Sequence, residues 1–167
     1  MESDESAELT KDQIHQSLSN TSVELHYVFW NVPRAVQVER PEPDKWSPLE
    51  ELIHLRQVGE VYASRVKRMV NLEAGEELPY LHNFDEEKQM SMINLSEETV
   101  KYNLGQFMQA RSELLGKISF LEADEWDKFK CRHETDGELT LRQLLIPLVK
   151  REEMHLNRIK ELLNTSV

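Results

Sequence analysis

Cysteine is almost absent from the sequence: Cys131 stands alone among 167 residues, so no internal disulfide can form. Glycine and proline are scarce as well, with 5 and 6 residues, which excludes a collagen-like chain and argues against a disordered one. Long hydrophobic runs are missing, and the acidic stretch from Met1 to Glu5 lacks the basic and apolar regions of a secretory signal. These absences predict a cytoplasmic protein that has no membrane partner.

Positive charge is also in short supply. The sequence carries 20 lysines and arginines against 31 acids, which gives a formal net charge of −11. A nucleic-acid-binding protein needs a positive field at its binding face, so we expect no nucleic acid partner. A chain of 167 residues is long enough to bury a core. We expect residues 1–167 to form one domain, in which residues 1–9 are a flexible tail.

Helical periodicity dominates the rest of the chain. Four stretches carry it, and no stretch of useful length alternates as a strand does, so the sequence predicts an all-α protein. The expected helices cover approximately residues 10–29, 48–70, 97–121 and 141–164, with a short helical piece around 86–90 in the connector between the second and the third.

Capping residues indicate where these helices start. Ser47 with Glu50, and Thr140 with Gln143, have the spacing of capping boxes, in which each side chain bonds the backbone N–H of the other residue. Ser96 is the expected cap of the third helix.

Four amphipathic helices with two long connectors predict a four-helix bundle with crossover connections. The connector 71–95 is too long for a tight hairpin, and we expect it to leave the second and third helices parallel. The loop 122–139 then turns the fourth helix antiparallel to both. With a rise of about 1.5 Å per residue, this arrangement brings His54 and His155 to one level at one end of the bundle.

The fourth helix has the clearest polar break in an apolar stripe. Its leucine-rich face is interrupted by Glu152 and His155, which are three residues apart and share a face. One interpretation is a buried core histidine paired with Glu152 or Arg151, because buried polar groups are normally hydrogen-bonded. The other is a metal ligand, for which neutral imidazole is the commonest protein donor. The residues alone leave both interpretations open.

Two more polar residues lie on predicted helices. His54 falls on the flank of the second helix's apolar stripe, a position typical of the surface. Arg111 occupies the centre of the third helix's stripe, where we favour a buried pair with a carboxylate over an anion-binding group.

Four motifs follow one another along nearly the whole chain. They are Arg40-Pro41-x-Pro43-Asp44-Lys45-Trp46-Ser47-Pro48-x-Glu50-x-x-x-His54-Leu55, then Arg111, then Gly137-Glu138-Leu139-Thr140-Leu141, and last His155-Leu156-x-Arg158-Ile159. In this combination they resemble the DinB-like family of bacterial four-helix proteins. The resemblance implies a bundle, often dimeric, that holds a divalent metal ion such as zinc, nickel or iron between three histidines at one end.

The resemblance also implies a small-molecule substrate, because characterised relatives include transferases and isomerases that use low-molecular-weight thiols such as bacillithiol or mycothiol. From it we expect a homodimer. One family histidine comes from the second helix and two come from a His-x-x-x-His pair on the fourth. His54 corresponds to the first of these ligands and His155 to the last.

The middle ligand is missing, since position 151 is arginine. A guanidinium stays protonated and has no lone pair to give a metal. Glu152 completes a site only if the helix is distorted near Pro147. We prefer the interpretation that Arg151 puts its own positive charge where the metal would be. It would then be held by an acid such as Glu50, Glu51 or another one nearby.

A di-iron site is a weaker alternative. Glu51-x-x-His54 and Glu152-x-x-His155 have the spacing of ferritin-like ligands, but such bundles also need an inward glutamate on each remaining helix, and the third helix offers Arg111 there. A loop cysteine two residues from a histidine is more often an unreactive thiol than an activated one, and we expect this of Cys131 beside His133. The other histidines, His15, His26 and His82, are expected at the surface.

The leading interpretation is a DinB-like protein related to metal-dependent thiol transferases, with an incomplete metal site formed by His54 and His155. The pocket residues that accompany them are Arg151, Glu152, Arg111 and Glu51. If this site binds metal and catalyses transfer or hydrolysis, Arg111 or Arg151 would hold a substrate carboxylate. The alternative is a non-enzymatic protein, dimeric or ligand-binding, that uses no metal.

Overall fold

Most of the chain is helical, as expected for the all-α class. The computed structural model describes residues 8–165, and the predicted tail falls largely on residues 1–7, which lie outside this range. The helices are α1 (Lys11–Val28), α2 (Arg34–Gln37), α3 (Pro48–Val70), α4 (Glu86–Ser91), α5 (Val100–Ile118) and α6 (Leu141–Thr165), with short 3-10 turns η1 (Leu95–Glu97) and η2 (Glu125–Asp127).

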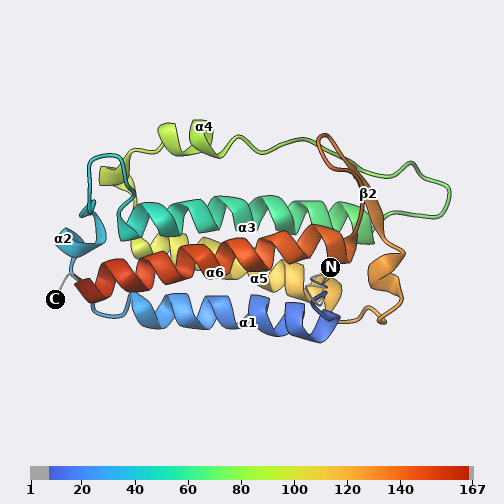
Figure 1. Ribbon diagram of the computed structural model, residues 1–167, viewed down its shortest axis with the longest axis horizontal. Helices are drawn as coiled ribbons and strands as arrows, with labels where there is room; N and C mark the ends of the chain where they lie inside the picture. The colour runs from blue at the N-terminus through green and yellow to red at the C-terminus, as the bar shows by residue number, and fades with distance from the viewer. Residues whose placement is uncertain (1–7, 166–167) are drawn as a thin grey trace, which may run out of the picture.

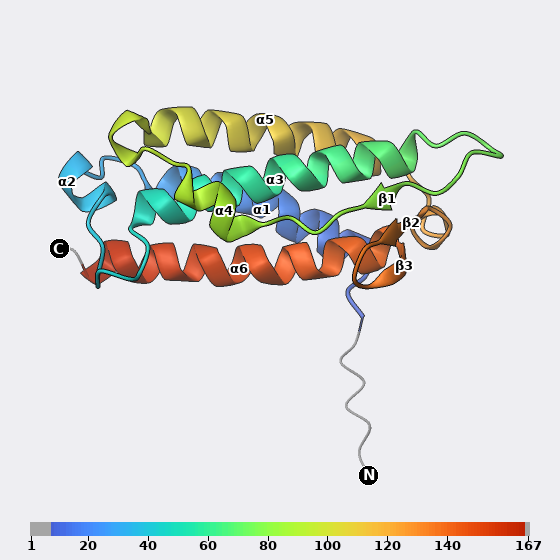
Figure 2. The ribbon, with the colours of Figure 1, turned by 90° about the horizontal axis from the view of Figure 1, so that it is seen from above.

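The long helices α1, α3, α5 and α6 lie side by side as a bundle (Figure 1). Helices α3 and α5 run in the same direction, and α1 and α6 run the opposite way (Figures 1 and 2). The connector between α3 and α5 carries α4 and returns along the length of the bundle. The predicted crossover and the antiparallel orientation of α6 are therefore confirmed.

Local capping explains most of the helix starts. Ser47 accepts a hydrogen bond from the Glu50 backbone N–H, and Glu50 accepts one from the Ser47 backbone N–H, so the predicted capping box is present. Thr140 and Gln143 exchange the same pair of bonds at the start of α6. The expected cap of the third helix was wrong: Thr99 caps α5, because Ser96 lies within the preceding 3-10 turn.

A small sheet lies at one end of the bundle and was not predicted. Strand β1 (Tyr80–Leu81) pairs in parallel with β2 (Lys130–His133), which pairs antiparallel with β3 (Gly137–Thr140). These strands are too short for an alternating pattern to stand out in the sequence. They tie the crossover connector to the hairpin that precedes α6.

Two apolar clusters fill the bundle. One includes Ile14, Leu18, Val66, Met69, Leu114, Trp126, Leu141, Leu145 and Leu148. The other includes Leu25, Phe29, Leu52, Ile53, Leu55, Phe107, Leu156 and Ile159, at the end where α3 begins and α6 finishes. Within residues 8–165, no helix combines the length and hydrophobicity needed to cross a membrane.

Candidate functional site

Two buried imidazoles meet where the start of α3 lies beside the end of α6. His54 is 1% exposed and His155 is 5% exposed, and their ring centroids are 4.6 Å apart. The indole of Trp46, just before α3, lies 5.0 Å from the His54 ring and 6.4 Å from the His155 ring. The predicted convergence of the two histidines is confirmed.

His155 is oriented by a buried carboxylate. Its Nδ1 lies 2.5 Å from Oε2 of Glu51, which is itself buried on α3. An ionised carboxylate only accepts hydrogen bonds, so we assign the proton of the pair to Nδ1 of His155. In the neutral form of this ring, Nε2 is then the nitrogen that carries the lone pair. The other carboxylate oxygen of Glu51 is 3.9 Å from the Arg158 guanidinium.

His54 differs from the surface position expected for it. Both of its ring nitrogens are buried and have no hydrogen-bond partner among the described residues. Burial, followed by the nearby charges of His155, Arg151 and Arg158, lowers the pKa of His54 to about 3. Its imidazole is therefore neutral at physiological pH and can accept a hydrogen bond.

Arg151 forms an ion pair with Glu86, the first residue of α4. Oε2 of Glu86 also lies 3.8 Å from Nε2 of His54. The acid that holds Arg151 therefore comes from the crossover connector. Glu50, another acid considered for this role, pairs with Arg40 at 2.6 Å. Burial opposes ionisation of Glu50, but hydrogen bonds from Arg40 and Ser47 outweigh it and lower the Glu50 pKa.

Arg111 and Glu152 form a separate buried pair between α5 and α6. Both Nη groups of Arg111 bond the Glu152 carboxylate, and Nη1 also donates to the backbone oxygen of Leu18 at 2.8 Å. The guanidinium carbon lies 4.8 Å from the centroid of the Phe107 ring. This is the pair with a carboxylate that we favoured for Arg111. Because the Glu152 carboxylate bonds Arg111 on α5, it is not directed toward the two histidines.

These residues do not fit a three-ligand metal centre. His54 and His155 offer two imidazole donors, but Arg151 stands one helical turn before His155 and cannot ligate a metal. Within the described part of the chain, no three histidine, cysteine or acidic side chains are arranged to hold a metal ion.

A cavity of about 630 Å³ is bordered by Trp46, which lies against both imidazoles, and by Glu51, which bonds His155. Arg158 borders it as well. Its remaining lining is Pro41, Glu42, Asp44, Lys45, Glu161 and Leu162. A second cavity, of about 560 Å³, is bordered by Glu86 and Arg151. Neither His54 nor His155 itself lines either cavity.

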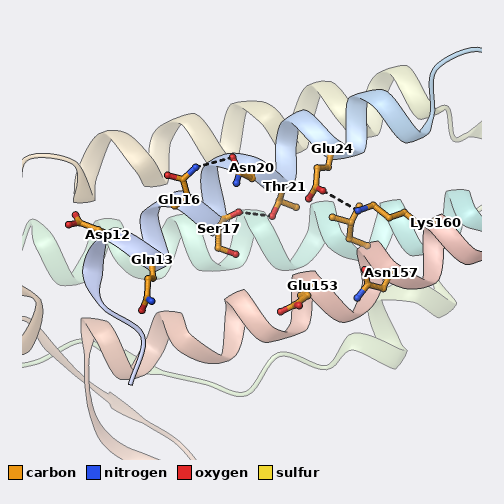
Figure 3. A pocket seen from close by; sticks show the side chains of 11 residues that line it. Asp12, Gln13, Gln16, Ser17, Asn20, Thr21, Glu24, Glu153, Asn157 and Lys160 are labelled. Atoms are coloured by element: carbon orange, nitrogen blue, oxygen red, sulfur yellow. Dashed lines mark hydrogen bonds and ion pairs between the residues drawn. The ribbon is translucent and has the colours of Figure 1, made fainter. Parts of the chain in front are cut away.

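A polar groove between α1 and α6 is a different kind of surface (Figure 3). Lys160 crosses it to pair with Glu24 at 3.0 Å, and Thr21 donates to the backbone oxygen of Ser17 within α1. Its lining includes neither histidine nor cysteine. The groove has carboxylates, among them Glu24 and Glu153, but lacks the imidazoles that distinguish the His54–His155 end.

The hypothesis drawn from the sequence did not include Glu86, and it gave no role to Trp46. Trp46 stood within a recognised motif, whereas Glu86 was part of a connector that has no motif.

Cys131 is fully buried, and this burial raises the pKa of its thiol, as expected of an unreactive cysteine.

The fold and the buried histidine pair define a four-helix-bundle protein with a polar site at one end. The chain belongs to the DinB superfamily, whose family model matches residues 18–159. The resemblance predicted from the motifs is confirmed. No curated protein sequence matches the chain.

Two solved structures share the fold. YfiT from Bacillus subtilis, described as a probable metal-dependent hydrolase with an unusual four-helix bundle topology, is 19% identical, with a TM-score of 0.78 over 99% of this chain and 93% of YfiT. TT2238, described as a four-helix bundle protein, is 17% identical, with a TM-score of 0.62 over 90% of this chain and 98% of TT2238. At these identities the likeness establishes the fold alone.

Proposed function

We propose that this protein binds a small molecule at the His54–His155 end of the bundle and that His155 accepts a proton from it. The observation that carries the proposal is a pair of buried imidazoles with hydrogen-bonding capacity to spare: both nitrogens of His54 lack a hydrogen-bond partner within residues 8–165, and Glu51 holds His155 through Nδ1. A buried polar group without a partner costs about 1–3 kcal/mol, which a bound ligand would offset.

The ligand class follows from these groups. A neutral His54 accepts a hydrogen bond from a thiol, hydroxyl or amine. Arg158, which is half exposed and borders the larger cavity, is placed to pair with a carboxylate of the ligand. A low-molecular-weight thiol that carries a carboxylate has both features, and low-molecular-weight thiols are the substrate class that the family resemblance implies.

The reaction class we favour is group transfer or hydrolysis without a three-ligand metal centre. Nε2 of His155 would take the proton of the thiol or hydroxyl, and the Glu51 carboxylate would stabilise the imidazolium that forms. A positioned general base of this kind contributes about 10²-fold to 10⁴-fold to a rate. The hydrolase description of YfiT belongs to that protein. We do not carry its metal dependence over to this chain, because Arg151 stands where the family resemblance implies a histidine ligand.

Paired ligands test the proposal. Glutathione and its S-methyl derivative differ in the S–H group, and we expect only the free thiol to shift the ring ¹⁵N resonances of His54 and His155. Quenching of Trp46 fluorescence, absent in Trp46→Phe, would place the ligand at this end of the bundle. If a broad panel of thiols, alcohols and amines leaves these resonances unchanged, the proposal is wrong.

A non-enzymatic binding protein is the second candidate, because the same spare hydrogen-bonding capacity would serve binding alone. His155→Gln separates the two. An enzyme would keep its ligand affinity within a few-fold and lose turnover, whereas a binding protein would show no turnover of the bound ligand in either form. The homodimer and the cytoplasmic location stay predictions from the sequence.

A further inference from the structure

We infer that the Arg151–Glu86 ion pair takes the place of a metal ion at this site. The inference is independent of the proposed ligand binding, because it concerns the protein's own charges. Arg151 lies one turn before His155 on α6, so the two side chains share a face of the helix. A third ligand supplied by α6 beside His155 would therefore come from position 151.

Glu86 places the ion pair beside the other histidine. One carboxylate oxygen of Glu86 bonds Arg151, and the second lies 3.8 Å from Nε2 of His54. This separation is too long for a hydrogen bond. The ion pair therefore lies next to the His54 imidazole without hydrogen-bonding it, and Arg151 stands one turn before His155 on the same helix. A metal held by both histidines would have this ion pair as its neighbour.

Each acid that contacts an imidazole already has a cationic partner. Glu51 lies near Arg158, and Glu86 pairs with Arg151. A divalent cation bound there would have to compete with these arginines for the two carboxylates and would face the guanidinium of Arg151. The guanidinium of Arg151 thus provides the positive charge that a metal ion would otherwise bring to this site.

Exposure makes the pair suitable for substitution. The side chains of Arg151 and Glu86 are 36% and 32% exposed, whereas Arg111 and Glu152 are 2% exposed. The Arg151–Glu86 pair also borders the smaller cavity, so an ion has a route to position 151. We expect Arg151→His to fold and to add the missing imidazole donor.

The test compares metal binding by three tag-free proteins: wild type, Arg151→His and Lys150→His. The last is a matched control, since it also exchanges a cation for an imidazole on α6, but at a neighbouring exposed position. Each is loaded with Zn²⁺, dialysed and analysed by mass spectrometry, and Co²⁺ absorption reports the coordination. We expect about one tightly held ion per chain for Arg151→His and none for the other two.

Three outcomes would overturn the inference. The first is stoichiometric metal in the wild type that is lost in His54→Ala or Glu86→Gln, because the native residues would then form a metal site themselves. The second is an Arg151→His protein that melts as a folded bundle but holds no ion. The third is equal binding by Lys150→His. None of these results depends on the thiol assays, so the inference and the proposed function can fail separately.

Discussion

Arg111 and Glu152 face each other inside the bundle, each 2% exposed, at the place where the two apolar clusters meet. Phe107 of one cluster lies against the guanidinium, and the backbone of Leu18 from the other accepts a hydrogen bond from it. The pair therefore joins α1, α5 and α6 through polar contacts in an otherwise apolar core.

Removing one member of this pair should strongly destabilise the protein. We expect Arg111→Met to lower the free energy of unfolding by about 3–5 kcal/mol, because Glu152 would be left as an unpaired buried charge. The double variant Arg111→Met with Glu152→Leu should recover most of the loss. Urea unfolding measures both, with the exposed Arg158→Met as a control that changes stability by less than about 1 kcal/mol. A single-variant loss as small as the control's would contradict this account.

Acid should destabilise the protein through His54. Its pKa is about 3 in the folded state, against about 6.5 when unfolded, so the unfolded chain binds more protons between these values and stability falls as the pH drops through this range. Above about pH 6.5 this contribution is constant. Between pH 7.5 and pH 5 we expect a loss of about 2 kcal/mol from this group.

Urea unfolding of wild type and His54→Gln at both pH values isolates the effect of His54. The variant should lose about 2 kcal/mol less than the wild type over this interval. His26→Gln is the control, since His26 is exposed and should change nothing. Equal pH dependence in wild type and His54→Gln would show that His54 is not held neutral by its surroundings.

The tautomer of His155 reports its bond to Glu51. We expect ¹⁵N spectra at pH 7 to show the proton on Nδ1 in the wild type, because the carboxylate can only accept. Glu51→Gln keeps an acceptor oxygen and should keep this tautomer, whereas Glu51→Ala should release the ring to the Nε2–H form. An unchanged tautomer in Glu51→Ala would mean that another group orients the imidazole.

Cys131 should be inert in the folded protein. It is fully buried and burial raises the pKa of its thiol, so reaction with a disulfide reagent at pH 8 should be more than about 100-fold slower than in urea. A control with Ser112→Cys in a Cys131→Ser background places one thiol at an exposed position of α5 and should react rapidly. Fast labelling of native Cys131 would contradict its burial.

Helical geometry allowed the meeting of His54 and His155 to be predicted from the sequence. His54 and His155 lie on long helices whose starts, lengths and relative direction follow from caps and apolar periodicity, so their meeting at one level could be worked out. The pair of Arg111 with a carboxylate was favoured for a similar reason, since a charge at the centre of an apolar stripe needs a partner.

Tertiary contacts decide the parts that sequence reasoning missed. Glu86 reaches Arg151 only because the crossover folds back over α3 and α6, and the sequence gives no period from which to place that segment. His54 lies on the flank of its helix, but its burial depends on neighbours from outside α3, including Trp46. Ser96 and Thr99 are both good caps, and local sequence alone does not choose between them.

The pairing of β1 with β2 has a consequence for Glu86, which follows β1 in the connector between α3 and α5. Strand β1 ends at Leu81 and α4 begins at Glu86, so the segment that carries this acid is short and starts from an anchored point. A chain tethered in this way has fewer conformations to lose than a free crossover would. The β2–β3 hairpin before α6 thus helps to hold Glu86 near the histidine site through β1. A substitution that weakens the pairing of β1 with β2 would therefore weaken the Arg151–Glu86 contact, although it changes no residue of the site itself.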